Sequence, residues 1–243
     1  MLKLFLAEIH KIKRMKIINT IYIGILFSMF LTSAQLKTRL QIITFEQLAS
    51  MAIYNHVLLV LPFCLSLVGG YMIDREYTQN TQKNLLTIPV QWSCVILAKI
   101  LVMLFLCVGA GVFANLVLVI TGFIINCSQI SAAVICRTLL MQFISYICVL
   151  IGVLPIILWF SKTEGKYLWG AALSLLLGVS GIFAANGLAA NWHPITYCFS
   201  IIQSNTVNTS VLNPPFSCIA MVIYILLAVM VFVILYGREV DTL

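Results

Sequence analysis

Charged residues are scarce in this sequence. Only 9% of its 243 residues are Asp, Glu, Lys or Arg, and 62% are hydrophobic. Soluble domains, by contrast, are about a quarter charged and about half apolar. A soluble fold of this length could not cover so much apolar surface, whereas a lipid bilayer removes the need for a polar exterior. The composition therefore excludes an ordinary soluble domain and indicates an integral membrane protein.

Patterns that carry catalysis or nucleotide binding are also missing. The chain has no G-x-x-x-x-G-K-[ST] phosphate loop, so it cannot hydrolyse ATP by that chemistry. Ionisable residues are almost absent from its apolar segments, and Lys99 and Arg137 fall near segment ends, from which they can reach the interface. This argues against a membrane-embedded hydrolase and a proton-coupled carrier. A metal site is not expected, because the three histidines lack ligand spacing: His10, His56 and His193.

The cysteines and the basic residues exclude two further classes. No C-x-x-C pair accompanies the eight cysteines, several of which lie in or beside apolar runs, where cysteine acts as a small hydrophobe. A disulfide between Cys198 and Cys218 is left open. The net charge of +7 does not indicate a nucleic-acid partner, because the basic residues mostly flank apolar segments instead of forming one solvated face.

Six apolar segments are long enough, or nearly so, to cross a bilayer of about 30 Å. They span residues 17–34, 52–73, 94–125, 133–160, 168–190 and 218–236. Residues 1–16 have the pattern of an amphipathic interfacial helix; the alternative is a basic flank that only fixes orientation. We therefore predict an all-α integral membrane protein in which residues 1–243 form one transmembrane domain.

Lys and Arg are distributed unequally between the two sides of this six-span arrangement. With the amino terminus inside, only three of the 14 fall outside: Lys37, Arg39 and Arg137. Because positive residues gather on the cytoplasmic side, both termini are predicted to be cytoplasmic. The segment 74–92 then faces the cytosol, and the uncharged loop 191–217 faces outward.

The segment 74–92 is the most informative polar stretch. Thr81 can open a short helix, Leu85 and Leu86 give it an apolar edge, and Pro89 stops it. A short helix held on two spans suits docking into a groove of a partner protein. An ordinary solvated loop fits these residues equally well.

The order of these residues is similar to that of a known family. The sequence resembles permease subunits of the type-2 ABC transporter superfamily, and within it the permeases of lantibiotic-immunity and bacitracin-resistance exporters of Gram-positive bacteria. The resemblance rests on an amino-terminal helix, six spans and these residues: Glu8-Ile9-His10-Lys11, Glu76, Thr81, Leu85-Leu86, Pro89 and Lys99.

The resemblance implies that residues 74–92 contain a coupling helix, which docks two copies of a cassette ATPase. ATP and Mg bind in that partner, so this chain is expected to be neither an enzyme nor a cofactor-binding protein. The docking surface would be Glu76, Thr81, Lys83, Leu85, Leu86 and Pro89. Outer-face contacts with the substrate would come from Trp192, Tyr197 and Phe199; the alternative is that these aromatic residues are plain membrane-surface anchors.

The resemblance further implies a bacterial plasma membrane protein in contact with lipid, paired with a homologous permease or a second copy of itself. Its expected substrate is an amphipathic antimicrobial peptide, expelled to give immunity or resistance. Two alternatives stay open. One is an exporter of a drug, lipid or polysaccharide, and the other is a stand-alone membrane immunity protein that sequesters a peptide without transport.

Overall fold

The computed structural model describes the chain except for residues 1, 13–14, 40–42, 79–90, 205–211 and 238–243. In the described part the chain forms helices and turns, with one isolated bridge between Thr44 and Ser128. Six helical runs are long and apolar enough to cross a membrane, which confirms the all-α membrane fold. These runs are Lys16–Thr38, Phe45–Thr78, Trp92–Ile124, Ala132–Phe160, Tyr167–Ala184 and Pro214–Tyr236.

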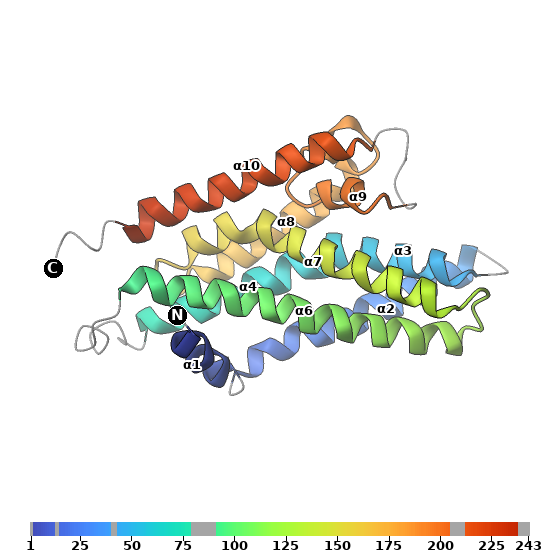
Figure 1. Cartoon of the computed structure of the whole chain (residues 1–243), viewed down its shortest axis with the longest axis horizontal. Helices are drawn as coiled ribbons and strands as arrows, with labels where there is room; N and C mark the ends of the chain where they lie inside the picture. Colours follow the sequence, from blue (N-terminus) through green and yellow to red (C-terminus); the bar gives the residue numbers. More distant parts are fainter. Residues whose placement is uncertain (1, 13–14, 40–42, 79–90, 205–211, 238–243) are drawn as a thin grey trace.

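The long helices lie side by side along one axis, and the short α1 lies against the start of α6 at an angle to them (Figure 1). The amino terminus is at the same end of the bundle as the end of α4 and the start of α6. In chain order the elements are α1 (Leu2–Ile12), η1 (Lys16–Ile18), α2 (Asn19–Arg39), α3 (Phe45–Asn55), η2 (His56–Val60), α4 (Leu61–Thr78), α6 (Trp92–Ile124), α7 (Ala132–Phe160), α8 (Tyr167–Ala184), η3 (Leu188–Asn191), α9 (Tyr197–Ile201), α10 (Pro214–Phe232) and η4 (Val233–Gly237).

The second membrane run is longer than the predicted 52–73 and is interrupted by a π-helical turn. It begins at Phe45, because Thr44 and Gln47 form a reciprocal capping box. The π turn η2 comes just before Pro62, which has no N–H to offer the Leu58 carbonyl four residues earlier. That carbonyl packs against Gly178 of α8, where a β-carbon would lie 2.1 Å from its oxygen. Glycine is therefore required where η2 and α8 pack against each other.

The fifth membrane run is shorter than the predicted 168–190. Its helix α8 ends at Ala184, and the chain then folds back through η3 and the buried α9. The Tyr197 hydroxyl donates to the Cys148 carbonyl of α7 at 2.7 Å. At Gly152 of α7 a β-carbon would lie 1.9 Å from the Pro194 carbonyl oxygen. The segment after α8 is thus packed into the bundle instead of crossing the membrane.

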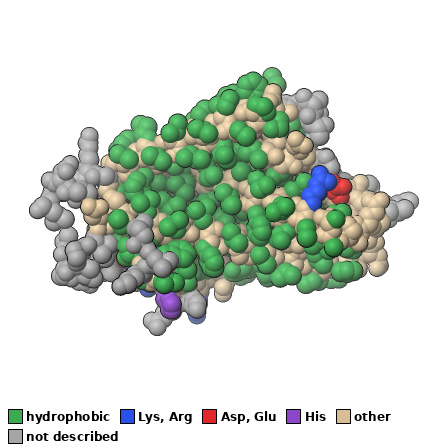
Figure 2. All heavy atoms as spheres, in the orientation of Figure 1, with side chains coloured by type: hydrophobic (Ala, Val, Ile, Leu, Met, Phe, Trp, Pro, Cys, Tyr) green, Lys and Arg blue, Asp and Glu red, His purple; other side chains and the backbone are tan. Residues whose placement is uncertain are grey.

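The outside of the bundle is apolar over the face shown in Figure 2. The run Pro214–Tyr236, which contains α10, is the most exposed of the six: only 11% of its apolar stretch is buried against the rest of the protein. Large exposed side chains such as Leu226 and Met230 would be unfavourable in water but suit a lipid environment. The exterior therefore agrees with the composition.

Candidate functional site

Four charged side chains form a closed ionic ring at the end of the bundle that carries the amino terminus. Lys99 Nζ lies 2.7 Å from Glu8 Oε2 and 3.0 Å from Glu76 Oε1. Lys11 Nζ lies 2.7 Å from Glu8 Oε1 and 2.9 Å from Glu76 Oε1. Two cations and two carboxylates thus alternate around the ring, and their formal charges cancel. We call Glu8, Lys11, Glu76 and Lys99 the ionic ring.

The ring joins three elements that are far apart in the sequence. Glu8 and Lys11 lie on α1, Glu76 lies on the last turn of α4, and Lys99 lies near the start of α6. Phe5 of α1 and Phe105 of α6 meet edge to face with ring centroids 6.5 Å apart, so α1 lies against α6. From this position Glu8 reaches Lys99 of α6, and Lys11 reaches Glu76 of α4.

Lys99 corrects an expectation from the sequence. Its side chain is not on the surface of the bundle, because it is only 2% exposed and both of its carboxylate partners are buried. A buried amine needs such partners to stay charged. Lys11 is more exposed: burial alone would lower its pKa, but the hydrogen bonds and charges of Glu8 and Glu76 outweigh burial and raise the pKa above 10.5. Lys11 therefore stays cationic at neutral pH.

Further contacts tie the neighbouring chain segments together at this end. The rings of Tyr77 and Trp92 meet edge to face with centroids 5.5 Å apart, so the end of α4 is held against the start of α6. Two residues before Glu76 on α4, the Asp74 carboxylate accepts a hydrogen bond of 2.8 Å from the Gly165 N–H in the turn between α7 and α8. Gly165 has a φ of +73°, which glycine adopts without strain.

The end of α10 is fixed at the same place. Its last carbonyls would otherwise lack intrahelical donors. The Ser93 hydroxyl at the start of α6 donates to the Tyr236 carbonyl at 2.9 Å, and Lys162 donates to the Leu235 carbonyl at 3.0 Å. This end of the bundle therefore brings together α1, α4, α6, the η4 continuation of α10, and the turn between α7 and α8.

Of the docking residues predicted from the sequence, the structure places one. Glu76 is buried in the ionic ring and is not on an open surface. Its charge is needed to compensate Lys99, which gives a physical reason for the burial. Thr81, Lys83, Leu85, Leu86 and Pro89 lie outside the described residues. All four members of the ring are among the residues on which the family resemblance rests, but the sequence did not pair them, because Glu8 and Lys99 are 91 positions apart.

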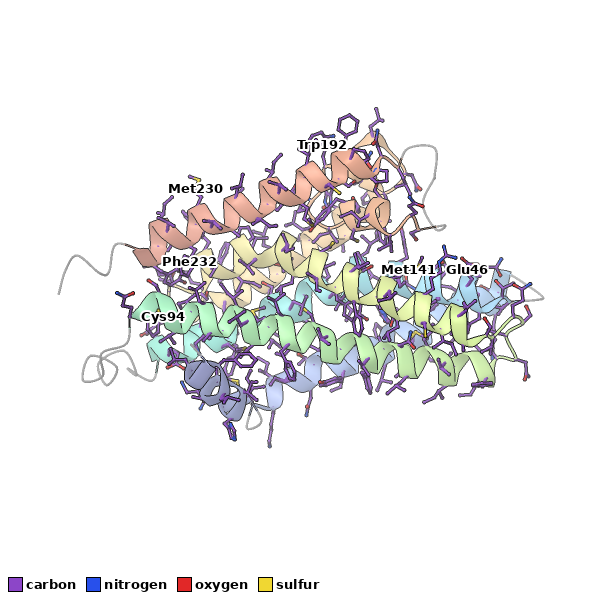
Figure 3. All side chains as sticks on the ribbon, in the orientation of Figure 1. Glu46, Cys94, Met141, Trp192, Met230 and Phe232 are labelled. Carbon is purple, nitrogen blue, oxygen red and sulfur yellow. The ribbon has the colours of Figure 1, made fainter. Side chains whose placement is uncertain are left out.

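The three outer-face residues are placed differently from one another. Tyr197 and Phe199 are buried: Tyr197 stacks on Tyr224 and Phe199 stacks on Tyr54. They hold α9 in the bundle and do not meet solvent or lipid in this structure. Trp192 is 47% exposed and projects at the end of the bundle opposite Cys94 (Figure 3).

The ionic ring has a structural role: it holds helices in place. No group of three His, Cys, Asp or Glu side chains able to hold a metal ion is found among the residues that the structure describes. All eight cysteines lie in described positions and are free, including Cys198, which is buried, and Cys218, which is exposed. The ionic ring instead fixes how α1, α4 and α6 sit relative to one another.

Comparison with known proteins gives one match. A family model described as "ABC-2 family transporter protein" matches residues 4–181, which include every member of the ionic ring. No curated protein and no solved structure matches the chain.

Proposed function

Because the chain belongs to the ABC-2 transporter family and is thus a membrane subunit that associates with a cassette ATPase, we propose that it is the permease of an ATP-driven exporter. The proposed substrate is an amphipathic antimicrobial peptide of the lantibiotic or bacitracin type. Its removal from a bacterial plasma membrane would protect the cell. Two ATPase copies would serve a pair of permeases, made of two copies of this chain or of this chain and a homologue.

The observation that supports the coupling part of this proposal is the ionic ring. The segment proposed to dock the ATPase leaves α4 two residues after Glu76 and enters α6 seven residues before Lys99. Movement of that segment would therefore act on two helices that the ring joins to each other and to α1. We propose Thr81, Lys83, Leu85, Leu86 and Pro89 as the docking surface, with Glu76 holding the helices instead of touching the ATPase.

The substrate part of the proposal relies on the outer end of the bundle. Trp192 contacts Phe216 at 5.9 Å between ring centroids, and both side chains are about half exposed. Exposed aromatic residues of this kind sit at the level of lipid headgroups, where an amphipathic peptide also lies. This pair is our candidate for the first contact with the peptide.

The docking proposal is tested by co-purification in mild detergent from native cells. A Thr81→Asp, Leu85→Asp variant is expected to lose the cassette ATPase that the wild type retains. The matched control is Thr38→Asp, which places a new carboxylate on an exposed threonine at the other end of the bundle and should retain the ATPase. If no ATPase accompanies even the wild type, the exporter proposal is wrong and a stand-alone immunity protein is favoured.

The substrate proposal needs a separate assay. Cells that express the chain together with its ATPase should survive higher concentrations of a lantibiotic or of bacitracin than cells with the ATPase alone. Cells expressing a drug-specific or lipid-specific exporter would show no such protection. An unchanged tolerance to every peptide tested, together with intact ATPase binding, would leave the permease assignment standing and remove the peptide as its substrate.

A further inference from the structure

The apolar interior is divided into two separate cores. The larger core contains Ile25 of α2, Ile53 of α3 and Ala114 of α6. The smaller core, at the outer end, contains Met29, Ala52 and Leu118 of the same helices. The boundary between them crosses each helix within about one turn. A plane without shared apolar packing therefore cuts through the outer half of the bundle.

Buried polar side chains lie on the same helices, on both sides of this boundary. We call them the polar layer: Thr32, Asn55, His56, Asn115, Thr138 and Gln142, from α2, α3, η2, α6 and α7. All of them are buried in a segment of the chain that is expected to lie within the membrane. Polar groups at that depth are unfavourable unless their hydrogen bonds are made, so each member needs a partner.

Part of the layer is satisfied by contacts between helices. The Asn55 amide donates to the Thr32 hydroxyl at 2.8 Å, and the Asn115 amide donates to the Thr138 hydroxyl at 3.2 Å. His56 Nδ1 and the Tyr146 hydroxyl are 2.9 Å apart. These bonds connect α2 to α3, α6 to α7, and η2 to α7.

Two members have hydrogen bonds left to make. Both the amide nitrogen and the amide oxygen of Gln142 are buried without a partner, and so is His56 Nε2. The His56 ring can reach a further partner in the Ile25 carbonyl, because a carbonyl oxygen that accepts the Ser28 hydroxyl has a second lone pair. Gln142 lies one turn from Tyr146, so the two side chains project from the same face of α7. The Gln142 amide is the group in the layer with both a donor and an acceptor unmet.

We infer that the polar layer holds internal water, bound at the Gln142 amide. The unmet groups include a donor and an acceptor on this one amide. A cation would satisfy only the acceptor, and an anion only the donor, whereas a water molecule satisfies both. Buried waters in proteins typically make about three such hydrogen bonds, and the Gln142 amide offers both a donor and an acceptor for them.

This inference is tested on the full chain in liposomes by solid-state NMR, with polarisation transferred from water protons. The side-chain amide of Gln142 should gain signal at least about threefold faster than the backbone amide of Leu58, which lies in the dry larger core. The exposed His10 ring gives the upper reference. Equal build-up for Gln142 and Leu58 would mean that no water is bound there.

A measurement of thermal stability gives an independent answer, because removal of the Gln142 amide should lower the unfolding midpoint if the amide binds water and raise it if the amide is dry. Gln142→Met keeps the volume but removes the amide. If water satisfies the amide, the variant loses those bonds and its unfolding midpoint falls by about 2–4 °C. If the amide is dry and unpaired, its removal raises the midpoint. Leu140→Met, at an exposed site on the same helix, is the control and should change nothing; an unchanged or raised midpoint for Gln142→Met overturns the inference.

Discussion

Replacement of Lys99 by methionine should destabilise the protein more than any other single change in the ionic ring. Lys99 is 2% exposed and holds oxygens of two buried carboxylates at 2.7 and 3.0 Å. Lys99→Met keeps the apolar stem but removes the charge, so the ring changes from neutral to a net charge of −1. Glu8 and Glu76 must then share Lys11, whose side chain is 43% exposed.

The size of the effect follows from this burial. Removing one partner of a buried ion pair costs about 3–5 kcal/mol, because an uncompensated charge remains in a poorly hydrated place. For a chain of this length 1 kcal/mol corresponds to roughly 2–4 °C in the unfolding midpoint. A fall of about 6–20 °C is therefore expected. Adding Glu76→Gln to Lys99→Met makes the ring neutral again, so the double variant should melt at a higher temperature than Lys99→Met.

The assay is thermal unfolding of the purified chain in detergent, followed by circular dichroism. The matched control is Arg137→Met, which breaks the exposed pair of Arg137 with Glu46 at 3.4 Å. Exposed pairs contribute less than about 1 kcal/mol, so this variant should melt close to the wild type. The reasoning fails if Lys99→Met melts like Arg137→Met, or if Glu76→Gln lowers the midpoint of Lys99→Met further.

Three other predictions use different parts of the structure. Gly178→Ala should lower the unfolding midpoint, because its β-carbon would meet the Leu58 backbone and overpacking costs about 1–3 kcal/mol; Gly109→Ala, with its nearest neighbour at 3.9 Å, should not. A membrane-impermeant thiol reagent should label a variant keeping only Cys136 in intact cells, and one keeping only Cys94 after permeabilisation; the reverse would invert the proposed topology. Trp192→Ala should lower peptide tolerance at least severalfold without loss of stability, since the side chain is half exposed; unchanged tolerance would remove Trp192 from the peptide site.

The sequence predicted the membrane helices well, because hydropathy is a local property of the chain. It misplaced the ends of two of them for reasons that are partly local as well. The capping box at Thr44 and Gln47 was present in the sequence, and it starts the second run seven positions before residue 52. The early end of α8 depends on tertiary packing, since η3 and α9 fold back only because α7 and α10 receive them.

The ionic ring and the polar layer could not be predicted in this way. Apart from Glu8 and Lys11, which lie three positions apart on α1, the partners are joined across 23 to 91 positions, and no periodic pattern connects them. Tyr197 and Phe199 were predicted to lie on the outer surface, but both are buried. Aromatic residues in an uncharged loop suggested an outer surface. Aromatic side chains are equally suited to burial when their polar atoms and rings have partners: the Tyr197 hydroxyl donates to the Cys148 carbonyl, and the Phe199 ring stacks on Tyr54.

Stability alone does not explain why the ring is made of charges. Well-packed apolar side chains are often as stabilising as a buried ion pair, or more so. A variant in which all four members become leucine or methionine should therefore fold and melt near the wild type. Apolar contacts are not directional, however, so α1 and α6 would no longer be fixed to the last turn of α4. If the ring transmits movement from the ATPase, this variant should bind the ATPase but lose peptide protection, whereas full protection would show that the ring serves only the fold.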